Sequence, residues 1–171
     1  MTYSIRQASL SDLEIIRELT FKVWPQTYAA ILSESQINYM LDLMYSIPAL
    51  TKQLTDPEHA FILVYDEELP VGFASYSPHH NEQWKLHKLY ILPAMQGKGL
   101  GKLILDYIIS DLRKRGINSL VLNVNRYNQA SLFYKKLGFK IIEETDVPIG
   151  NGYFMNDYIM EIKMEDTKSS K

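Results

Sequence analysis

Gln96-Gly97-Lys98-Gly99-Leu100-Gly101-Lys102 is the stretch that decides the fold of this chain. It follows a short run of β-branched and aromatic residues, 89–93, and opens a strongly periodic helix expected over 100–115. Three alternating glycines strip side chains from this strand-to-helix turn, so the N–H groups of the first helical turn are free to face a ligand. The helix dipole and the two lysines place positive charge at the same point. The stretch therefore predicts an anion site, most often one for phosphate.

Composition limits the class of protein. A chain of 171 residues with 46% hydrophobic and 22% charged residues suits one soluble globular domain, expected over 1–164 with a disordered polar tail at 165–171. The net charge of −2 argues against a nucleic-acid partner. The sequence has no apolar run long enough to span a bilayer and no signal-peptide core, so we expect no membrane partner. The absence of cysteine fits a reducing compartment, and we expect the protein to be cytoplasmic.

Hydrophobic periodicity predicts the order of the elements. Strands are expected at 3–7, 60–65, 71–77, 85–92, 119–124, 140–144 and 153–163. One helix should start at a capping box, Ser11–Glu14, and stop before Pro25. A second should start at Ser33 and end at Pro48, with a short helical piece after it to about 54. A last helix should be capped by Asn128.

This order predicts an α/β fold, a mixed α+β sheet of seven strands flanked by helices. The strand–helix–strand crossover at 85–124 requires a parallel pair within that sheet. Parallel strands bind ligands at their carboxyl ends, where neighbours separate. Residues 92–101 lie at such an end.

The glycine spacing excludes two common phosphate motifs. A Walker A loop needs Ser or Thr after Gly-Lys, and Gly101-Lys102 is followed by Leu103. A dinucleotide fingerprint would need glycine at position 102, and it would need an acidic residue after the next strand, where Asn123 and Asn125 stand instead.

The pattern Gln-x-x-Gly-x-Gly, made by Gln96, Gly99 and Gly101, is similar to that of the GCN5-related N-acetyltransferases (GNAT). A second stretch, Asn128–Phe139, resembles the helix that precedes the last two strands in that family. The resemblance covers the whole element order. Four less specific stretches, at 21–28, 39–41, 133–136 and 157–160, resemble the polyamine (spermidine/spermine) N-acetyltransferase branch.

The resemblance implies acetyl-CoA as donor and no metal. The implied cofactor-binding residues are Leu89, Tyr90, Ile91, Gln96, Gly97, Lys98, Gly99, Leu100, Gly101, Lys102, Asn123, Asn128 and Tyr134. The backbone of 97–102 would cradle the pyrophosphate, and the pantetheine arm would pair with 89–91 like an added strand. An N–H group of Tyr90 or Ile91 would polarise the thioester carbonyl, and Tyr134 would protonate the departing thiolate.

The base that deprotonates the attacking amine is less determined. Glu82 is the first candidate, and His79, His87 or a water relay through backbone carbonyls would serve as well. No covalent enzyme intermediate is needed. The histidines show no metal-ligand spacing apart from the pair at 79–80, which more often is a solvated turn.

The acceptor site is expected beside the first helices and the last strands. Its candidate lining residues are Trp24, Tyr28, Tyr39, Trp84 and Asp157, and each aromatic one could equally be a packing residue. Three functions stay open: acetylation of a primary amine on a small, polyamine-like molecule, acetylation of a protein N-terminus or lysine, and non-catalytic acyl-CoA binding. A homodimer joined through the C-terminal strands is a further expectation from the resemblance.

Overall fold

The computed structural model describes residues 2–164, which form two compact units. The first unit comprises Met1–Ser77 and His87–Leu105, and the second Pro78–Leu86 and Asp106–Lys171. One sheet with the strand order β1-β2-β3-β4-β5-β7-β6 runs through the chain, and it contains both parallel and antiparallel pairs. The prediction of a mixed, seven-stranded α/β sheet is therefore confirmed. A single domain over 1–164 stays a prediction, and the tail expected at 165–171 lies outside the described residues.

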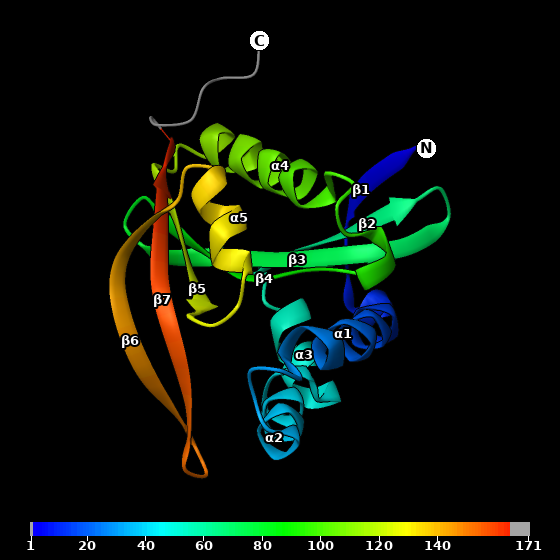
Figure 1. Ribbon diagram of the computed structural model, residues 1–171. Coiled ribbons are helices and arrows are strands. Elements are labelled where there is room, and N and C mark those ends of the chain that lie inside the picture. Colours follow the sequence, from blue (N-terminus) through cyan, green and yellow to red (C-terminus); the bar gives the residue numbers. More distant parts are fainter. Residues whose placement is uncertain (1, 165–171) are drawn as a thin grey trace. The chain divides into compact units, whose positions relative to one another are not determined.

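The first unit holds the β1 end of the sheet, where β1 pairs with β2 and β2 with β3 in antiparallel register. Its strands are β1 (Tyr3–Gln7), β2 (Ala60–Asp66), most of β3 (Leu69–His80) and the second half of β4 (Gln83–Ile91). Three helices, α1 (Leu13–Tyr28), α2 (Glu34–Tyr45) and α3 (Ile47–Leu54), pack against one another, as Figure 1 shows in blue to cyan. Both faces of the strands are buried here, since Phe61, Ile62, Leu63 and Val64 are all at most 3% exposed.

The second unit holds the parallel pair. The first half of β4 runs parallel to β5 (Ser119–Asn125), which pairs with β7 (Tyr153–Lys163), and β7 pairs with the edge strand β6 (Lys140–Gly150). The helix α4 (Leu100–Lys114) makes the crossover between β4 and β5, and α5 (Ala130–Lys136) follows β5. The hairpin of β6 and β7 is the orange and red pair in Figure 1.

The start of α1 differs from the sequence expectation. The capping residues are Ser9 and Asp12, with a 3-10 turn at Leu10–Asp12, rather than a box starting at Ser11. The Asp12 carboxylate accepts a hydrogen bond from Ser9 N at 2.9 Å and pairs with Arg6 at 2.8 Å. Arg6 comes from β1, so this local start depends on a partner outside the helix.

Pro25 lies inside α1, and the helix continues to Tyr28. A proline in a helix interior removes one backbone hydrogen bond and costs about 3 kcal/mol. The last turn is nevertheless closed, because Ala29 N donates to Pro25 O at 3.0 Å. The aromatic packing of Trp24 and Tyr28 offsets the cost, so the expectation that the helix stops before Pro25 is wrong.

Three other expected boundaries shift. Ser46 caps α3 through Ala49 N, and Pro48 stands in the first turn of that helix rather than at the end of α2. β3 continues through the segment at 78–80 that the sequence assigns to a turn, and β6 is longer than expected, ending at Gly150. Both strands are extended by their hairpin partners.

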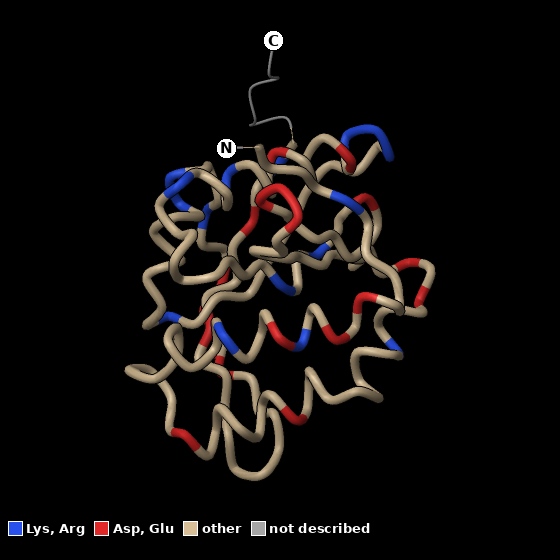
Figure 2. The backbone as a smooth tube through the Cα atoms, turned by 90° about the vertical axis from the view of Figure 1, so that its right-hand side faces the viewer, with Lys and Arg blue, Asp and Glu red and all other residues tan. Residues whose placement is uncertain are grey.

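Segments of both charge signs are interspersed over much of the described trace (Figure 2), but no Lys or Arg occurs between Lys22 and Lys52. No helix within 2–164 has the length and apolar character needed to cross a bilayer.

Candidate active site

The glycine loop lies between the end of β4 and the start of α4, within the first unit. Gly97 and Gly99 have φ angles of 80° and 81°, the left-handed region that disfavours residues with a Cβ. No atom outside their immediate chain neighbours lies within 4 Å of an ideal Cβ at either position, so the surface above them is open. Gln96 Nε2 donates to Ile91 O at 3.2 Å and ties the loop back to the end of β4. The backbone is thus held in a shape that exposes it to a ligand.

This loop has the features of a phosphate-binding turn. α4 begins at Leu100, and the first backbone bond into it runs from Leu103 N to Gly99 O at 3.1 Å. The N–H groups of the residues before Leu103 are those that a helix leaves without an internal acceptor. Lys98 and Lys102 are exposed beside them. An open turn with free donors and two ammonium groups suits a doubly charged phosphate ligand.

The strand that leads into this loop is paired in parallel with β5 over only part of its length. The parallel register between β4 and β5 runs from Gln83–Ser119 to Leu86–Leu122 and ends there, although β4 continues to Ile91 and β5 to Asn125. On its other side β4 is packed tightly, because a Cβ at Gly72 would lie 2.8 Å from Tyr90 O. The backbone of 89–91 is therefore fixed from the β3 side.

An aromatic cluster forms on α1, α2 and β4 in the first unit. The ring of Trp24 lies 4.6 Å from that of Tyr28, 5.6 Å from Tyr45 and 6.0 Å from Tyr90, centroid to centroid. The hydroxyl groups of Tyr28 and Tyr90 are 3.1 Å apart. Tyr45 is 1% exposed, and this burial raises the pKa of its hydroxyl. Two predicted acceptor residues, Trp24 and Tyr28, are thus brought together with the β4 residue Tyr90.

A buried lysine lies against this cluster. Lys88 is 7% exposed, and its Nζ lies 4.5 Å from the centroid of the Tyr45 ring. Burial lowers the pKa of Lys88 to about 8. Burial and then the Lys88 charge lower the pKa of His59 to about 4, so His59 is neutral at pH 7. Lys88 was not predicted as a site residue from the sequence. A signal was present, because alternate residues of a strand share a face, and Lys88 follows Trp84 and Leu86 on the buried face of β4.

The helix α5 carries Tyr134 in the second unit. Tyr134 is 8% exposed, and its ring makes edge contacts with Phe133 and Phe139 at 5.3 and 5.4 Å. Asn128 Oδ1 accepts from Ala130 N at 2.9 Å, but the N-cap residue of α5 is Gln129, so the prediction of Asn128 as the cap is wrong by one residue. The ring of Tyr134 is fixed by packing, which suits a residue that must present its hydroxyl in one direction.

Two predicted residues of different roles meet in the second unit. Asn123, expected at the cofactor, donates through Nδ2 to Asp157 Oδ2 at 3.2 Å, and Asp157 was expected at the acceptor. Asp157 is 1% exposed. Burial raises its pKa above the usual aspartate range, although Asn123, Lys85 and Arg126 each favour the charged form.

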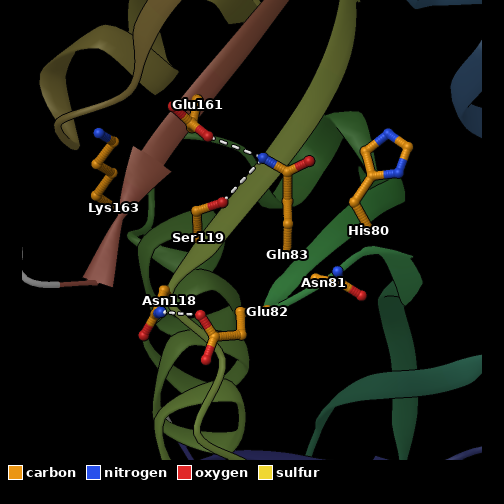
Figure 3. Close-up of a pocket in the computed structure, with 8 residues that line it drawn as sticks. All are labelled: His80, Asn81, Glu82, Gln83, Asn118, Ser119, Glu161 and Lys163. Carbon is orange, nitrogen blue, oxygen red and sulfur yellow. Dashed lines mark hydrogen bonds between the residues drawn. The ribbon is translucent and has the colours of Figure 1, made fainter.

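Glu82 stands at the beginning of β4, in the turn after β3, with a φ of 58°. Its Oε2 accepts from Asn118 Nδ2 at 2.8 Å. Figure 3 shows it in a polar pocket of about 530 Å³ within the second unit. The pocket is lined by His80, Asn81, Glu82, Gln83, Asn118, Ser119, Glu161 and Lys163. This is the amino end of the parallel pair, whereas ligands of such pairs bind at the carboxyl end, so the placement does not favour Glu82 as the base.

The remaining candidate residues are spread over both units. Trp84 is buried in the second unit, with the Arg115 guanidinium 4.9 Å above its ring. Tyr39 is half-buried on α2. In the first unit His87 Nε2 lies 2.7 Å from Ser77 Oγ, and its ring lies 5.0 Å from that of His59. His79 stacks on His80 at 4.1 Å. Among residues 2–164, no three His, Asp or Glu side chains are grouped so that they could hold a metal ion.

Comparison with known proteins identifies the class. The acetyltransferase (GNAT) family pattern matches residues 14–139, and this chain belongs to that family. It is an acetyl-CoA-dependent N-acetyltransferase, which confirms the donor and the reaction type that the sequence resemblance implied.

Individual relatives are similar over different lengths. A spermidine N(1)-acetyltransferase of Thermoplasma acidophilum is 31% identical over 170 residues, covering 96% of this chain and 99% of the relative. The crystal structure of the PaiA N-acetyltransferase of Thermoplasma acidophilum, in complex with coenzyme A, superposes with a TM-score of 0.82 at 30% identity, covering 95% of this chain and 99% of that one. A ribosomal protein bS18-alanine N-acetyltransferase of Haemophilus influenzae is 40% identical over 58 residues, which is 34% of this chain and 40% of the relative.

The loop conformation predicts a specific effect of Gly99→Ala. Alanine in the left-handed region costs about 1–2 kcal/mol, and a loop that leaves this conformation no longer directs its N–H groups at the ligand. We expect the dissociation constant for CoA, measured by calorimetry, to rise about tenfold. Gly116→Ala is the matched control, since Gly116 has a φ of 74° and an equally open surface but lies after α4. An equal loss of CoA affinity in both variants would contradict the role of the loop.

Lys88 predicts a pH dependence of stability. Its pKa is about 8 in the folded protein, against 10.5 for a lysine in water, so the unfolded chain binds more protons between these values and wild-type stability rises with pH there. The difference corresponds to about 3 kcal/mol. Urea unfolding should show Lys88→Met more stable than wild type at pH 7.5, with the advantage shrinking towards pH 10. A constant difference between the two proteins over this range would show that Lys88 keeps its ordinary pKa.

Proposed function

We propose that this enzyme acetylates a primary amine of a small, polyamine-like molecule. The observation that carries the proposal is the similarity, over nearly the whole of both chains, to the spermidine N(1)-acetyltransferase of Thermoplasma acidophilum. The amine attacks the thioester directly while donor and acceptor are both bound. No cysteine is present to form an acyl-enzyme.

The donor is assigned the residues that the sequence resemblance implies. The backbone of 97–102, with Gln96 holding the loop, binds the pyrophosphate. The residues Leu89, Tyr90 and Ile91 pair with the pantetheine arm, and an N–H group of Tyr90 or Ile91 stabilises the oxyanion. Asn128 is also assigned to cofactor binding. Tyr134 gives its hydroxyl proton to the thiolate as the C–S bond breaks.

The acceptor's chemistry fits the side chains available. Aromatic faces attract an alkylammonium ion and pack against methylene groups, and Trp24 and Tyr28 offer both in one cluster. Tyr39, in the first unit, and Trp84, in the second, are further candidates for contact with the acceptor. A carboxylate is needed for the ammonium groups, and Asp157, which is 1% exposed, is assigned this role.

A second candidate is acetylation of a protein N-terminus or lysine. The local similarity to the bS18-alanine N-acetyltransferase of Haemophilus influenzae favours it. That similarity covers about a third of the chain, whereas the polyamine relative covers nearly all of it. A non-catalytic acyl-CoA-binding role is set aside, because the chain belongs to a family of transferases.

The test is CoA release from acetyl-CoA with a panel of polyamines, short alkylamines, amino acids and peptides, for wild type and Tyr134→Phe. We expect the polyamines to give the highest kcat/KM. Tyr134→Phe keeps the contacts with Phe139 but loses the acid, so kcat should fall about 100-fold or more with CoA affinity unchanged. Tyr127→Phe, at a tyrosine that is 68% exposed, is the matched control and should retain full activity. Peptides reacting faster than every small amine would reverse the choice of acceptor.

The enzyme is also assigned a homodimer and a cytoplasmic location. The dimer proposal is supported by β6, an edge strand on which Ile142 is 55% exposed. Sedimentation should give a dimer at micromolar concentration, and Ile142→Lys should shift it to monomer. Leu43→Lys, at a leucine of α2 that is 48% exposed, should leave the dimer intact. A wild-type monomer at high micromolar concentration would contradict the proposal.

A further inference from the structure

Asp157 is a buried carboxylate at one end of the second unit's sheet. It lies on β7 opposite Asn125, the last residue of β5. The chain leaves β5 at this point, turns at Asn128 and enters α5, the helix that carries Tyr134. The carboxyl ends of parallel strands are where ligands of such sheets bind. Asp157 is therefore at the ligand end of β5.

The side chains around Asp157 come from three strands and one turn. Lys85 pairs with Val121 and Asp157 pairs with Asn125, and directly paired residues share a face of the sheet. Alternate residues of β5 also share a face, so Lys85, Asn123, Asn125 and Asp157 all lie on one. Asn123 Nδ2 holds Asp157 Oδ2 at 3.2 Å. The charged groups that act on Asp157 are Lys85 on β4, Arg126 after β5 and Asp146 on β6.

The cation of Arg126 is already neutralised. Its guanidinium pairs with Asp146 at 2.7 Å and with Glu144 at 3.1 Å, and it also donates to the backbone carbonyl of Asp157 at 3.3 Å. Lys85 is thus the cation left to balance the Asp157 carboxylate. Burying a carboxylate with so little compensation is costly, and the raised pKa of Asp157 expresses that cost.

Such a carboxylate suits proton transfer from an ammonium ion. An alkylammonium has a pKa of about 10.4 and must lose a proton before it can attack. A base works best when its pKa lies near the operating pH, and burial moves the pKa of Asp157 in that direction. Glu82 lies at the opposite end of β5, beyond Ser119, and six residues of strand correspond to about 20 Å. The two carboxylates cannot serve the same nitrogen.

We propose that the Asp157 carboxylate is the proton acceptor for the substrate ammonium, and that Asn123 is a positioning residue that holds its Oδ2. This inference rests on the proposed function and names the base that the function requires. It also places Asn123 with the acceptor rather than with the cofactor.

Protons and electron pairs balance over the whole reaction. The ammonium gives one proton to Asp157, and the free amine attacks the carbonyl carbon to form a C–N bond. The C–S bond breaks, and the thiolate takes the hydroxyl proton of Tyr134. After the attack the nitrogen carries two hydrogens. One stays in the amide and the other passes as a proton to the Tyr134 oxygen, while Asp157 releases its proton to solvent. The products are the N-acetyl amine, CoA and one proton.

The test is the pH dependence of kcat with the best amine of the panel. Asp157→Asn should lower kcat about 100- to 10,000-fold and abolish the acidic limb of the profile, with CoA affinity and melting temperature close to wild type. Lys85→Met should move the acidic limb to higher pH, because the cation that favours the carboxylate is lost. Asp157→Glu should restore part of the activity. Asp111→Asn removes a partly exposed carboxylate from α4 and should match wild type.

The outcomes separate the possible failures. If Asp157→Asn keeps more than a third of wild-type kcat with the same acidic limb, Asp157 is not the base. If Asp157→Asn unfolds, an unchanged acidic limb in Lys85→Met overturns the inference by itself. If wild type binds CoA but acetylates no amine of the panel, the proposed function fails, and this inference fails with it.

Discussion

The parallel pairing of β4 with β5 is the constraint on which the rest of this protein depends. Parallel neighbours cannot be joined by a tight turn, so a crossover helix is required, and here it is α4. The helix has to start directly after β4, which places its free N–H groups at the end of that strand. Glycines at 97 and 99 allow the chain to make this turn with positive φ and without side chains over the donors. The donor site is therefore a consequence of the topology.

The same pairing leaves backbone available for the donor. The register between β4 and β5 lasts only from Gln83–Ser119 to Leu86–Leu122, and each strand then continues without the other. The position of 89–91 is nevertheless fixed, because Gly72 lets β3 approach the Tyr90 carbonyl closely. A rigid, extended backbone of this kind suits an extended ligand that adds to it as a strand.

Each unit also buries one charged group with little compensation. In the first unit the Lys88 ammonium lies on the Tyr45 ring, and in the second the Asp157 carboxylate is held by Asn123. Burial shifts both pKa values towards neutrality, downwards for the lysine and upwards for the aspartate. Sites with such shifts are more often functional than structural, since a core without them would be more stable.

Local sequence predicted the structure correctly where the conformation depends only on neighbouring residues. The strand and helix order, the cap at Ser33 and the glycine turn were all predicted. It was a poor guide where a distant partner intervened. Arg6 moved the start of α1 to Ser9, and aromatic packing carried α1 through Pro25. Propensity is a weak prior in both cases, and tertiary contacts override it.

By itself, the sequence determined the fold class, the family and the donor, because these depend on spacing along the chain: the glycines at 97, 99 and 101 and the periodicity around them. Only the tertiary structure decided which side chains meet. It joined Asn123 to Asp157, set Tyr90 against Trp24 and Tyr28, and placed Glu82 beside Asn118 at the amino end of the parallel pair. Strand register and burial produce these meetings, and both arise from contacts between residues far apart in sequence.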